Sequence, residues 1–264
     1  MSEALQVEQR ERVLWLTINR PEKRNALTSE LCREMVDAVN HANHDPGVGA
    51  IVLAANGSAF SAGMDLGEVA RVNPKSLSDL HEQLFTMGLR IGKPLVAAVQ
   101  GPALGGGMGL VANCHVVIAT EAAQFGLTEI RLGLWPFLVF QAVATSLGER
   151  RAVELALTGR VFDAQEARTL SLVQEIVPDA AARAMEVARG LSESSPTAIR
   201  SGLSFVEEAR GKNMVLASQI ARRVREELFT TPDFQEGIRA FLEKRKPHWP
   251  SLGQKNDYPG DSTP

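Results

Sequence analysis

The sequence predicts an α/β fold. Short apolar runs typical of buried strands alternate with helical patterns along the first two-thirds of the chain. Two of these runs, 50–54 and 94–99, precede glycine-containing turns at 61–65 and 104–110, and a helical pattern follows each turn. From about residue 179 onward the pattern is helical throughout, which indicates a separate helical region.

The elements can be assigned in order from the N-terminus. A strand pair is expected first, and then a helix whose apolar residues recur at helical spacing and which Thr28 or Ser29 can cap. The predicted strands are 6–10, 13–18, 50–54, 94–99, 115–119 and 171–177. The predicted helices are 28–43, 78–91, a short one that opens at the triple glycine, 141–158, 163–170, 198–229 and 233–246.

The pattern divides the chain into three parts. Residues 1–195 form the α/β core, 196–252 a helical region, and 253–264 a polar tail with Gly and Pro that we expect to be loose. Within the core, Asp163 and Glu166 have the spacing of a capping box. The helical region has apolar faces but little sheet left to cover, so we expect it to be buried between subunits.

Composition excludes several classes of protein. Among 264 residues, 44% are hydrophobic, the net charge is −3, and no basic stripe interleaved with aromatics occurs, which argues against a nucleic-acid partner. Two cysteines in unrelated contexts suit a reducing compartment. The N-terminus lacks a signal-type apolar core, and Pro94, Gly101 and Pro102 interrupt the uncharged stretch between Lys93 and Glu121. We therefore expect a cytoplasmic protein without a membrane span.

The two glycine turns suggest one anion-binding device. A strand, a glycine-rich turn and a helix start together point bare backbone N–H groups into a cleft, and the helix terminus favours negative charge. Two such turns could hold one anionic oxygen. Two other interpretations stay open: a tight turn with close helix packing, and a dinucleotide fingerprint at 107–112. The fingerprint would place Glu121, and not Glu129, at the tip of the next strand.

Six segments of the chain form an ordered set: 19–27, 60–66, 101–107, 125–129, 157–160 and 241–246. They resemble the successive motifs of the enoyl-CoA hydratase/isomerase (crotonase) family. The resemblance implies a crotonase-like spiral of ββα units with a helical C-terminal trimerisation region, assembled as a trimer or a dimer of trimers. It also implies an enzyme that handles acyl-CoA thioesters through an enolate, with no metal and no cofactor beyond the coenzyme A part of the substrate.

The resemblance assigns roles residue by residue. The amides of Met64 and Gly106 would hold the thioester oxygen, and Glu129 would move a proton at C2 or C4 of the acyl chain. In an apolar pocket such a carboxyl has a pKa raised toward neutrality. Residues expected to contact coenzyme A are Lys23, Arg24, Ala26, Ala62, Asp65, Phe241 and Lys244, the last two possibly from a neighbouring subunit. The expected acyl pocket comprises Met108, Trp135, Phe137 and Phe140, although core packing accounts for the aromatics about as well.

The chain departs from the hydratase pattern at Gly109, where hydratases of the family usually have a second glutamate. Two carboxylates hold and activate water, whereas one suffices to shuttle a proton between carbons. We therefore favour double-bond isomerisation slightly over hydration by Glu129, alone or with an unidentified partner. A non-catalytic acyl-CoA-binding protein is the alternative of another class. Phe137 replaces the aspartate of dienoyl-CoA isomerases, and Gly67 replaces a lysine expected near the phosphates.

Overall fold

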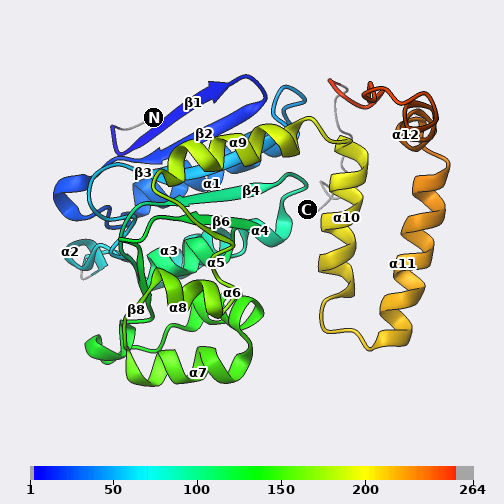
Figure 1. Cartoon of the computed structure of the whole chain (residues 1–264). Helices are drawn as coiled ribbons and strands as arrows, with labels where there is room; N and C mark the ends of the chain where they lie inside the picture. Colours follow the sequence, from blue (N-terminus) through cyan, green and yellow to red (C-terminus); the bar gives the residue numbers. More distant parts are fainter. Residues whose placement is uncertain (1–2, 70, 254–264) are drawn as a thin grey trace.

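The computed structural model describes residues 3–69 and 71–253, and its centre is a six-stranded sheet in the order β1-β2-β3-β4-β6-β9 (Figure 1). β1 is antiparallel to β2, and every other neighbouring pair is parallel. The loops that leave the parallel strands therefore gather at one edge of the sheet. The strands are β1 (Leu5–Arg10), β2 (Val13–Ile18), β3 (Ala50–Ala55), β4 (Leu95–Val99), β6 (Val116–Ala119) and β9 (Glu175–Ile176).

Helices cover both faces of this sheet. On one face, α9 (Ala180–Ser192) packs its alanines against alternate strand residues such as Trp15 and Val52. On the other face, α1 (Ser29–His44), α3 (Pro74–Phe85) and α5 (Gly106–Ala112) form the main core with residues such as Leu16 and Leu53. The central strands β2, β3, β4 and β6 are buried on both faces, which explains why they read as continuous apolar runs.

A second, three-stranded sheet lies beside the end of β4. It consists of β5 (Ala103–Leu104), β7 (Gln124–Gly126) and β8 (Phe162–Asp163). β5 and β7 are parallel, and β7 and β8 are antiparallel. The sequence gives no period-two signal for strands this short, so the sheet was not predicted.

Several predicted elements are confirmed and several are interrupted. Helix α1 begins as expected, with the Thr28 hydroxyl accepting from the Leu31 amide at 3.3 Å. The predicted helix 78–91 is wrong as one element, because the chain breaks at Thr86 between α3 and α4 (Met87–Arg90). The predicted helix 141–158 is likewise two helices, α6 (Phe137–Leu147) and α7 (Glu149–Thr158), separated by Gly148 at φ +83°.

The region around α8 (Ala164–Thr169) also differs in detail. Asp163 caps this helix by accepting from the Glu166 amide at 2.8 Å. The Glu166 side chain does not reach back to complete a capping box, because it pairs with Arg160. The predicted strand 171–177 shrinks to β9, since Ser171 takes a left-handed turn conformation at φ +66°.

The C-terminal helices form an arm that stands away from the sheet (Figure 1). They are α10 (Pro196–Ala209), α11 (Met214–Phe229) and α12 (Pro232–Leu242), and we call residues 196–242 the helical arm. The predicted continuous helix 198–229 is wrong: Gly211 reverses the chain at φ +69°, and Asn213 caps α11 by accepting from the Leu216 amide. The expected loose tail lies outside the described residues, apart from Gly253.

Within residues 3–69 and 71–253, no helix combines the length and the apolar character needed to cross a membrane.

Candidate active site

The glycine turn after β3 lies directly against the turn that opens α5. Gly63 has φ +88°, a backbone conformation that L side chains rarely adopt. A methyl group built on Gly63 would lie 3.0 Å from the carbonyl oxygen of Leu104 and 3.1 Å from the amide nitrogen of Gly106. The two turns can therefore approach this closely only because residue 63 has no side chain.

Two backbone amides of these turns, those of Met64 and Gly106, have no hydrogen-bond acceptor among the described residues. The pairing of Leu27 with Met64 uses the Gly63 carbonyl, at 2.8 Å, and the Asp65 amide, at 2.9 Å, so the Met64 amide is not part of it. Gly106 is the first residue of α5, and the residue that caps it has no side chain. Among the described residues neither amide donates to a protein acceptor.

A buried asparagine, which sequence reasoning missed as a site residue, braces this arrangement. The Asn25 side chain donates to the carbonyls of Asn56, at 2.8 Å, and Ala59, at 2.7 Å. The Ser61 hydroxyl donates to the Asn25 carbonyl at 2.8 Å and accepts from the Gly63 amide at 3.2 Å. The only sequence signal was the position of Asn25 within the segment 19–27.

Pairing of β5 with β7 carries Glu129 to the glycine turn. Leu104 lies opposite Gly126, and the Gly105 amide donates to the Gly126 carbonyl at 2.8 Å. Glu129 begins the short helix η2 (Glu129–Leu132) three residues later. A methyl group built on Gly105 would lie 3.2 Å from Glu129 Oε1. The structure therefore brings together Met64, Gly106 and Glu129, which sequence reasoning had placed in one site.

The environment of Glu129 is that of a carboxyl held away from water. The residue is 8% exposed, and its Oε2 atom has no hydrogen-bond partner among the described residues. Burial raises the pKa of the Glu129 carboxyl, and a hydrogen bond with its own backbone amide opposes part of that rise. A buried carboxyl with a free oxygen and a raised pKa, set beside unpaired backbone donors, suits proton transfer to and from carbon.

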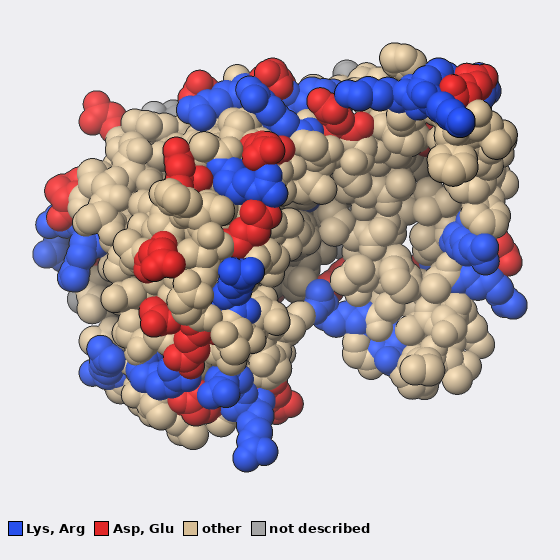
Figure 2. Space-filling model, viewed as in Figure 1, with Lys and Arg blue, Asp and Glu red and all other residues tan. Residues whose placement is uncertain are grey.

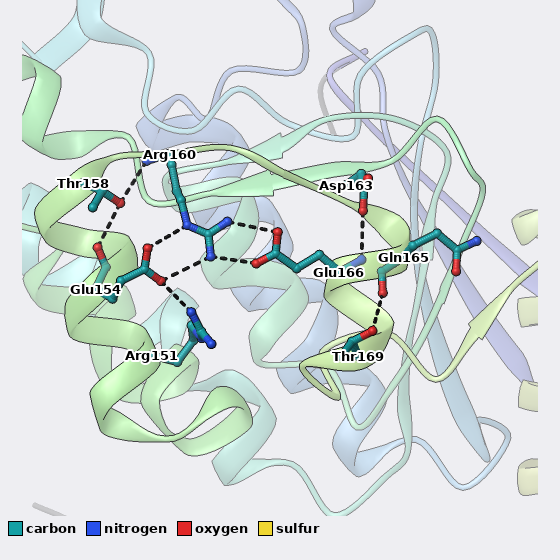
Figure 3. Close-up of polar contacts among 8 residues, drawn as sticks. All are labelled: Arg151, Glu154, Thr158, Arg160, Asp163, Gln165, Glu166 and Thr169. Carbon is teal, nitrogen blue, oxygen red and sulfur yellow. Dashed lines mark hydrogen bonds and ion pairs between the residues drawn. The ribbon is translucent and has the colours of Figure 1, made fainter.

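An ion-pair network centred on Arg160 joins α7 to α8 (Figure 3). Arg160 lies between two carboxylates, with Nε 2.6 Å from Glu154 of α7 and Nη2 2.7 Å from Glu166 of α8. The preceding residue, Gly159, accepts a 2.6 Å hydrogen bond from Arg131, which belongs to η2. The network thus fixes the segment on which η2 rests.

Three predicted coenzyme A residues lie beside the glycine turn after β3. Lys23 and Arg24 are exposed at the end of the short helix η1 (Pro21–Lys23). The Arg24 carbonyl accepts from the Ala62 amide at 2.9 Å, which fastens this cationic turn next to the turn that carries Met64.

Arg20, which was not predicted, connects two further residues of this region. Its guanidinium donates to the Ala26 carbonyl and lies 3.1 Å from Asp65 Oδ2. The Asp65 carboxylate is thus held by an ion pair, and its other oxygen accepts from the Gly67 amide at 3.2 Å at the start of α2 (Leu66–Val69). These bonds give Asp65 a clear part in shaping the turn.

The remaining predicted coenzyme A residues lie elsewhere. Phe241, in α12, is 82% exposed, and Lys244 follows the end of that helix. Figure 1 places α12 at the opposite end of the molecule from α2, which follows the glycine turn. One chain therefore does not bring Phe241 and Lys244 to the site.

The four residues predicted for the acyl pocket have different surroundings. Trp135 and Phe140 pack together on the main core with ring centroids 5.8 Å apart. Met108 is fully buried within that core, two residues after Gly106 in α5. Phe137, the first residue of α6, is 71% exposed, so it does not wall an enclosed space in this chain.

Position 109, where a second acid was expected in a hydratase, is closed to any side chain. A methyl group built on Gly109 would lie 2.3 Å from Val139 Cγ1 and 2.8 Å from Val139 Cβ. Val139 extends from α6 and is itself buried. The two residues are thus complementary: the valine fills the space that the glycine leaves.

Comparison with known proteins agrees with this fold. Residues 8–252 match the family model described as enoyl-CoA hydratase/isomerase. The 2,3-dehydroadipyl-CoA hydratase of Escherichia coli is 36% identical over 255 residues, covering 94% of this chain and 98% of that protein. An enoyl-CoA hydratase of Mycobacterium tuberculosis is 35% identical over 257 residues, covering 92% of this chain and 95% of its own.

Solved structures give the same answer. The enoyl-CoA hydratase of Bacillus anthracis superposes with a TM-score of 0.88 at 30% identity, covering 95% of this chain and all of that one. The architecture is therefore the crotonase fold. The chain belongs to the enoyl-CoA hydratase/isomerase family and is an acyl-CoA enzyme of that family.

Proposed function

We propose that this protein is a single-carboxylate acyl-CoA enzyme that moves a double bond from C3 to C2 of an enoyl thioester faster than it hydrates the product. The observation that carries the proposal is the contact between Gly109 and Val139. A hydratase with two acids needs a second carboxylate beside the triple glycine, and here a valine side chain fills that space. One buried carboxyl is enough to carry a proton between two carbons of the same substrate.

In this mechanism Glu129 acts twice on one substrate. Its carboxylate removes a proton from C2 of the 3-enoyl thioester, and the electron pair delocalises into a dienolate. The developing charge on the thioester oxygen is met by the amides of Met64 and Gly106, donors of a kind worth roughly 3–4 kcal/mol each in comparable sites. The protonated Glu129 then returns the same proton to C4, which gives the 2-enoyl thioester and regenerates the carboxylate.

The raised pKa of Glu129 suits both halves of this reaction. A carboxyl with a raised pKa is a stronger base toward the proton next to the thioester and is still able, once protonated, to return that proton. Burial is the main cause of the rise, and the substrate's own acyl chain would exclude water further.

For the coenzyme A moiety we propose the cationic turn at Lys23 and Arg24 as the phosphate contact. Both side chains are exposed on a turn whose backbone is tied to Ala62. Cationic groups of this kind bind phosphate through charge-assisted hydrogen bonds. We propose that Phe241 and Lys244 complete the site from a neighbouring copy of the chain. No other cofactor is required for the proposed reaction.

We propose that the helical arm assembles the chain into a trimer or a dimer of trimers. No residue of α10 or α11 is buried within the single chain. Apolar side chains on the arm are exposed: Val206, Met214, Val215, Leu216, Phe241 and Leu242. Such a surface favours contact with another subunit. Light scattering at micromolar concentration tests this, and a monomer of 28.6 kDa would contradict it.

Hydration is the second candidate, because the relatives named above are described as hydratases. The decisive experiment incubates the purified protein with 2-enoyl- and 3-enoyl-CoA thioesters in heavy-oxygen water and analyses the products by mass spectrometry. An unlabelled product isobaric with the substrate indicates isomerisation, and uptake of the label indicates hydration. Rapid hydration of crotonyl-CoA would overturn the isomerase proposal, and binding without turnover of any thioester would favour a non-catalytic acyl-CoA-binding protein.

A further inference from the structure

The ring of Phe85, the last residue of α3, lies against the glycines of α5. A methyl group built on Gly106 would lie 3.1 Å from Phe85 Cζ, and one built on Gly109 would lie 3.2 Å from Phe85 Cδ1. Residues three apart share one face of a helix, so the ring covers a strip of α5 that carries no side chains. That strip begins at the amide of Gly106.

A cavity of about 390 Å³ lies beyond the ring, between the core and α10 of the helical arm. Phe85 forms part of its wall, together with the end of α5 at Ala112 and Asn113 and with Leu138 of α6. Figure 2 shows a hollow between the body of the molecule and the arm. Because α5 rises about 1.5 Å per residue over its seven residues, this end lies roughly 10 Å from the Gly106 amide.

Phe85 is fixed in this position from several sides. The residue is 4% exposed and belongs to the main core. Its ring also packs on His81, one turn earlier in α3, with centroids 5.6 Å apart at 57°. A buried aromatic side chain held between two elements does not swing aside without disturbing both of them.

The cavity differs in character from an apolar pocket. Asn113 is buried in its wall and donates through Nδ2 to the Gly109 carbonyl at 2.9 Å. Its Oδ1 atom accepts no hydrogen bond from any described residue. Gln141 and Arg210 also line the cavity and Glu129 does not, so the cavity is partly polar and distinct from the space around Glu129.

We infer that Phe85 ends the acyl pocket and sets its chain-length preference, so that the enzyme acts on short-chain acyl-CoA thioesters and excludes long chains from the cavity behind the ring. The inference rests on the proposed function, because it concerns the acyl group of the same thioester. The chain leaves the thioester carbon at Gly106, meets the strip of α5 without side chains, and stops where Phe85 and Val139 cover it.

The test compares kcat/KM for butenoyl-, hexenoyl- and decenoyl-CoA in the wild type and in Phe85→Ala. In the wild type, kcat/KM should fall at least tenfold from the shortest to the longest chain. Removal of the ring should reverse this trend, with kcat/KM rising roughly fourfold for each methylene group that reaches the cavity. Leu84→Ala, a neighbouring fully buried residue of α3, is the matched control and should leave the preference unchanged.

A second variant fills the cavity from the α6 side of its wall. In the wild type, Leu138→Trp should leave kcat/KM unchanged for every chain length, because acyl chains do not reach the cavity. In the Phe85→Ala background it should abolish the rise in kcat/KM for long chains. Loss of long-chain activity in Leu138→Trp alone would show that chains already enter the cavity, which overturns the inference even if Phe85→Ala does not fold. A wild-type kcat/KM that does not change with chain length also overturns the inference. No turnover of any thioester rejects the proposed function itself.

Discussion

We expect that a glutamate at position 109 will not be accommodated unless Val139 is replaced by a smaller residue at the same time. In Gly109→Glu the new Cβ would lie 2.3 Å from Val139 Cγ1, closer than real carbon atoms approach, so α5 and α6 must separate. Overpacking of a buried contact costs about 1–3 kcal/mol, and replacing a helical glycine returns up to about 1 kcal/mol. The middle of these ranges is a net loss of about 1–2 kcal/mol, which corresponds to a Tm lower by roughly 2–8 °C for a chain of this size.

The double variant Gly109→Glu with Val139→Ala removes both methyl groups of the valine and so relieves the closer of the two contacts, whereas the 2.8 Å approach to Val139 Cβ remains. We expect its Tm to recover relative to Gly109→Glu and the ratio of hydration to isomerisation to rise by about tenfold or more, the lower range for one positioned acid. Val139→Ala alone controls for the loss of packing. Differential scanning calorimetry and product analysis in heavy-oxygen water supply the two measurements. A Gly109→Glu protein as stable as the wild type would refute the steric argument, and a double variant with an unchanged ratio would refute the role assigned to the missing acid.

Four further perturbations test the site. Glu129→Gln should lower turnover at least about a hundredfold with acyl-CoA binding kept within a few-fold, and unchanged turnover would remove Glu129 from the mechanism. The pKa of Glu129 is raised in the folded state, so the wild type loses stability as pH rises from the ordinary glutamate pKa through the raised one. The Gln variant should therefore have a higher Tm than the wild type at pH 8 but not at pH 4. Gly106→Pro deletes one donor and should abolish activity, as measured by turnover of a thioester that the wild type accepts. Gly63→Ala places a side chain at φ +88° and should lower kcat more than binding, which steady-state kinetics with a separate binding titration resolves. Arg160→Leu removes two partly exposed ion pairs and should cost about 1 kcal/mol, less at high salt; equal unfolding midpoints in urea would contradict this.

The site was predictable to the extent that it depends on strand order and backbone. Parallel strands β3 and β4 are neighbours, so the glycine turns that follow them meet at one edge, and the sequence pattern of strand, turn and helix was sufficient to expect this. The spacing of Leu31 and Val39 likewise located the buried face of α1.

What could not be predicted depends on contacts between distant segments. The breaks at Gly148 and Gly211 lie inside patterns that are helical on both sides, and only the packing of the two helices decides where the chain turns. Asn25 and Val139 carry no local signal either: an asparagine in a turn and a valine in a helix are ordinary until their tertiary partners are known. The strands β5, β7 and β8 are too short for periodicity to reveal them.

The proton-transfer site is assembled only by pairings between segments far apart along the chain. Leu27 pairs with Met64, Ser61 with Ala103, and Leu104 with Gly126, so no contiguous fragment contains a working part of it. Such non-local contacts form late, because the intervening loops must first be closed. Catalytic activity therefore reports on completion of the whole core. After dilution from denaturant, the helical circular dichroism signal should return before turnover does. A protein with native helix content but one unformed strand pairing should be inactive.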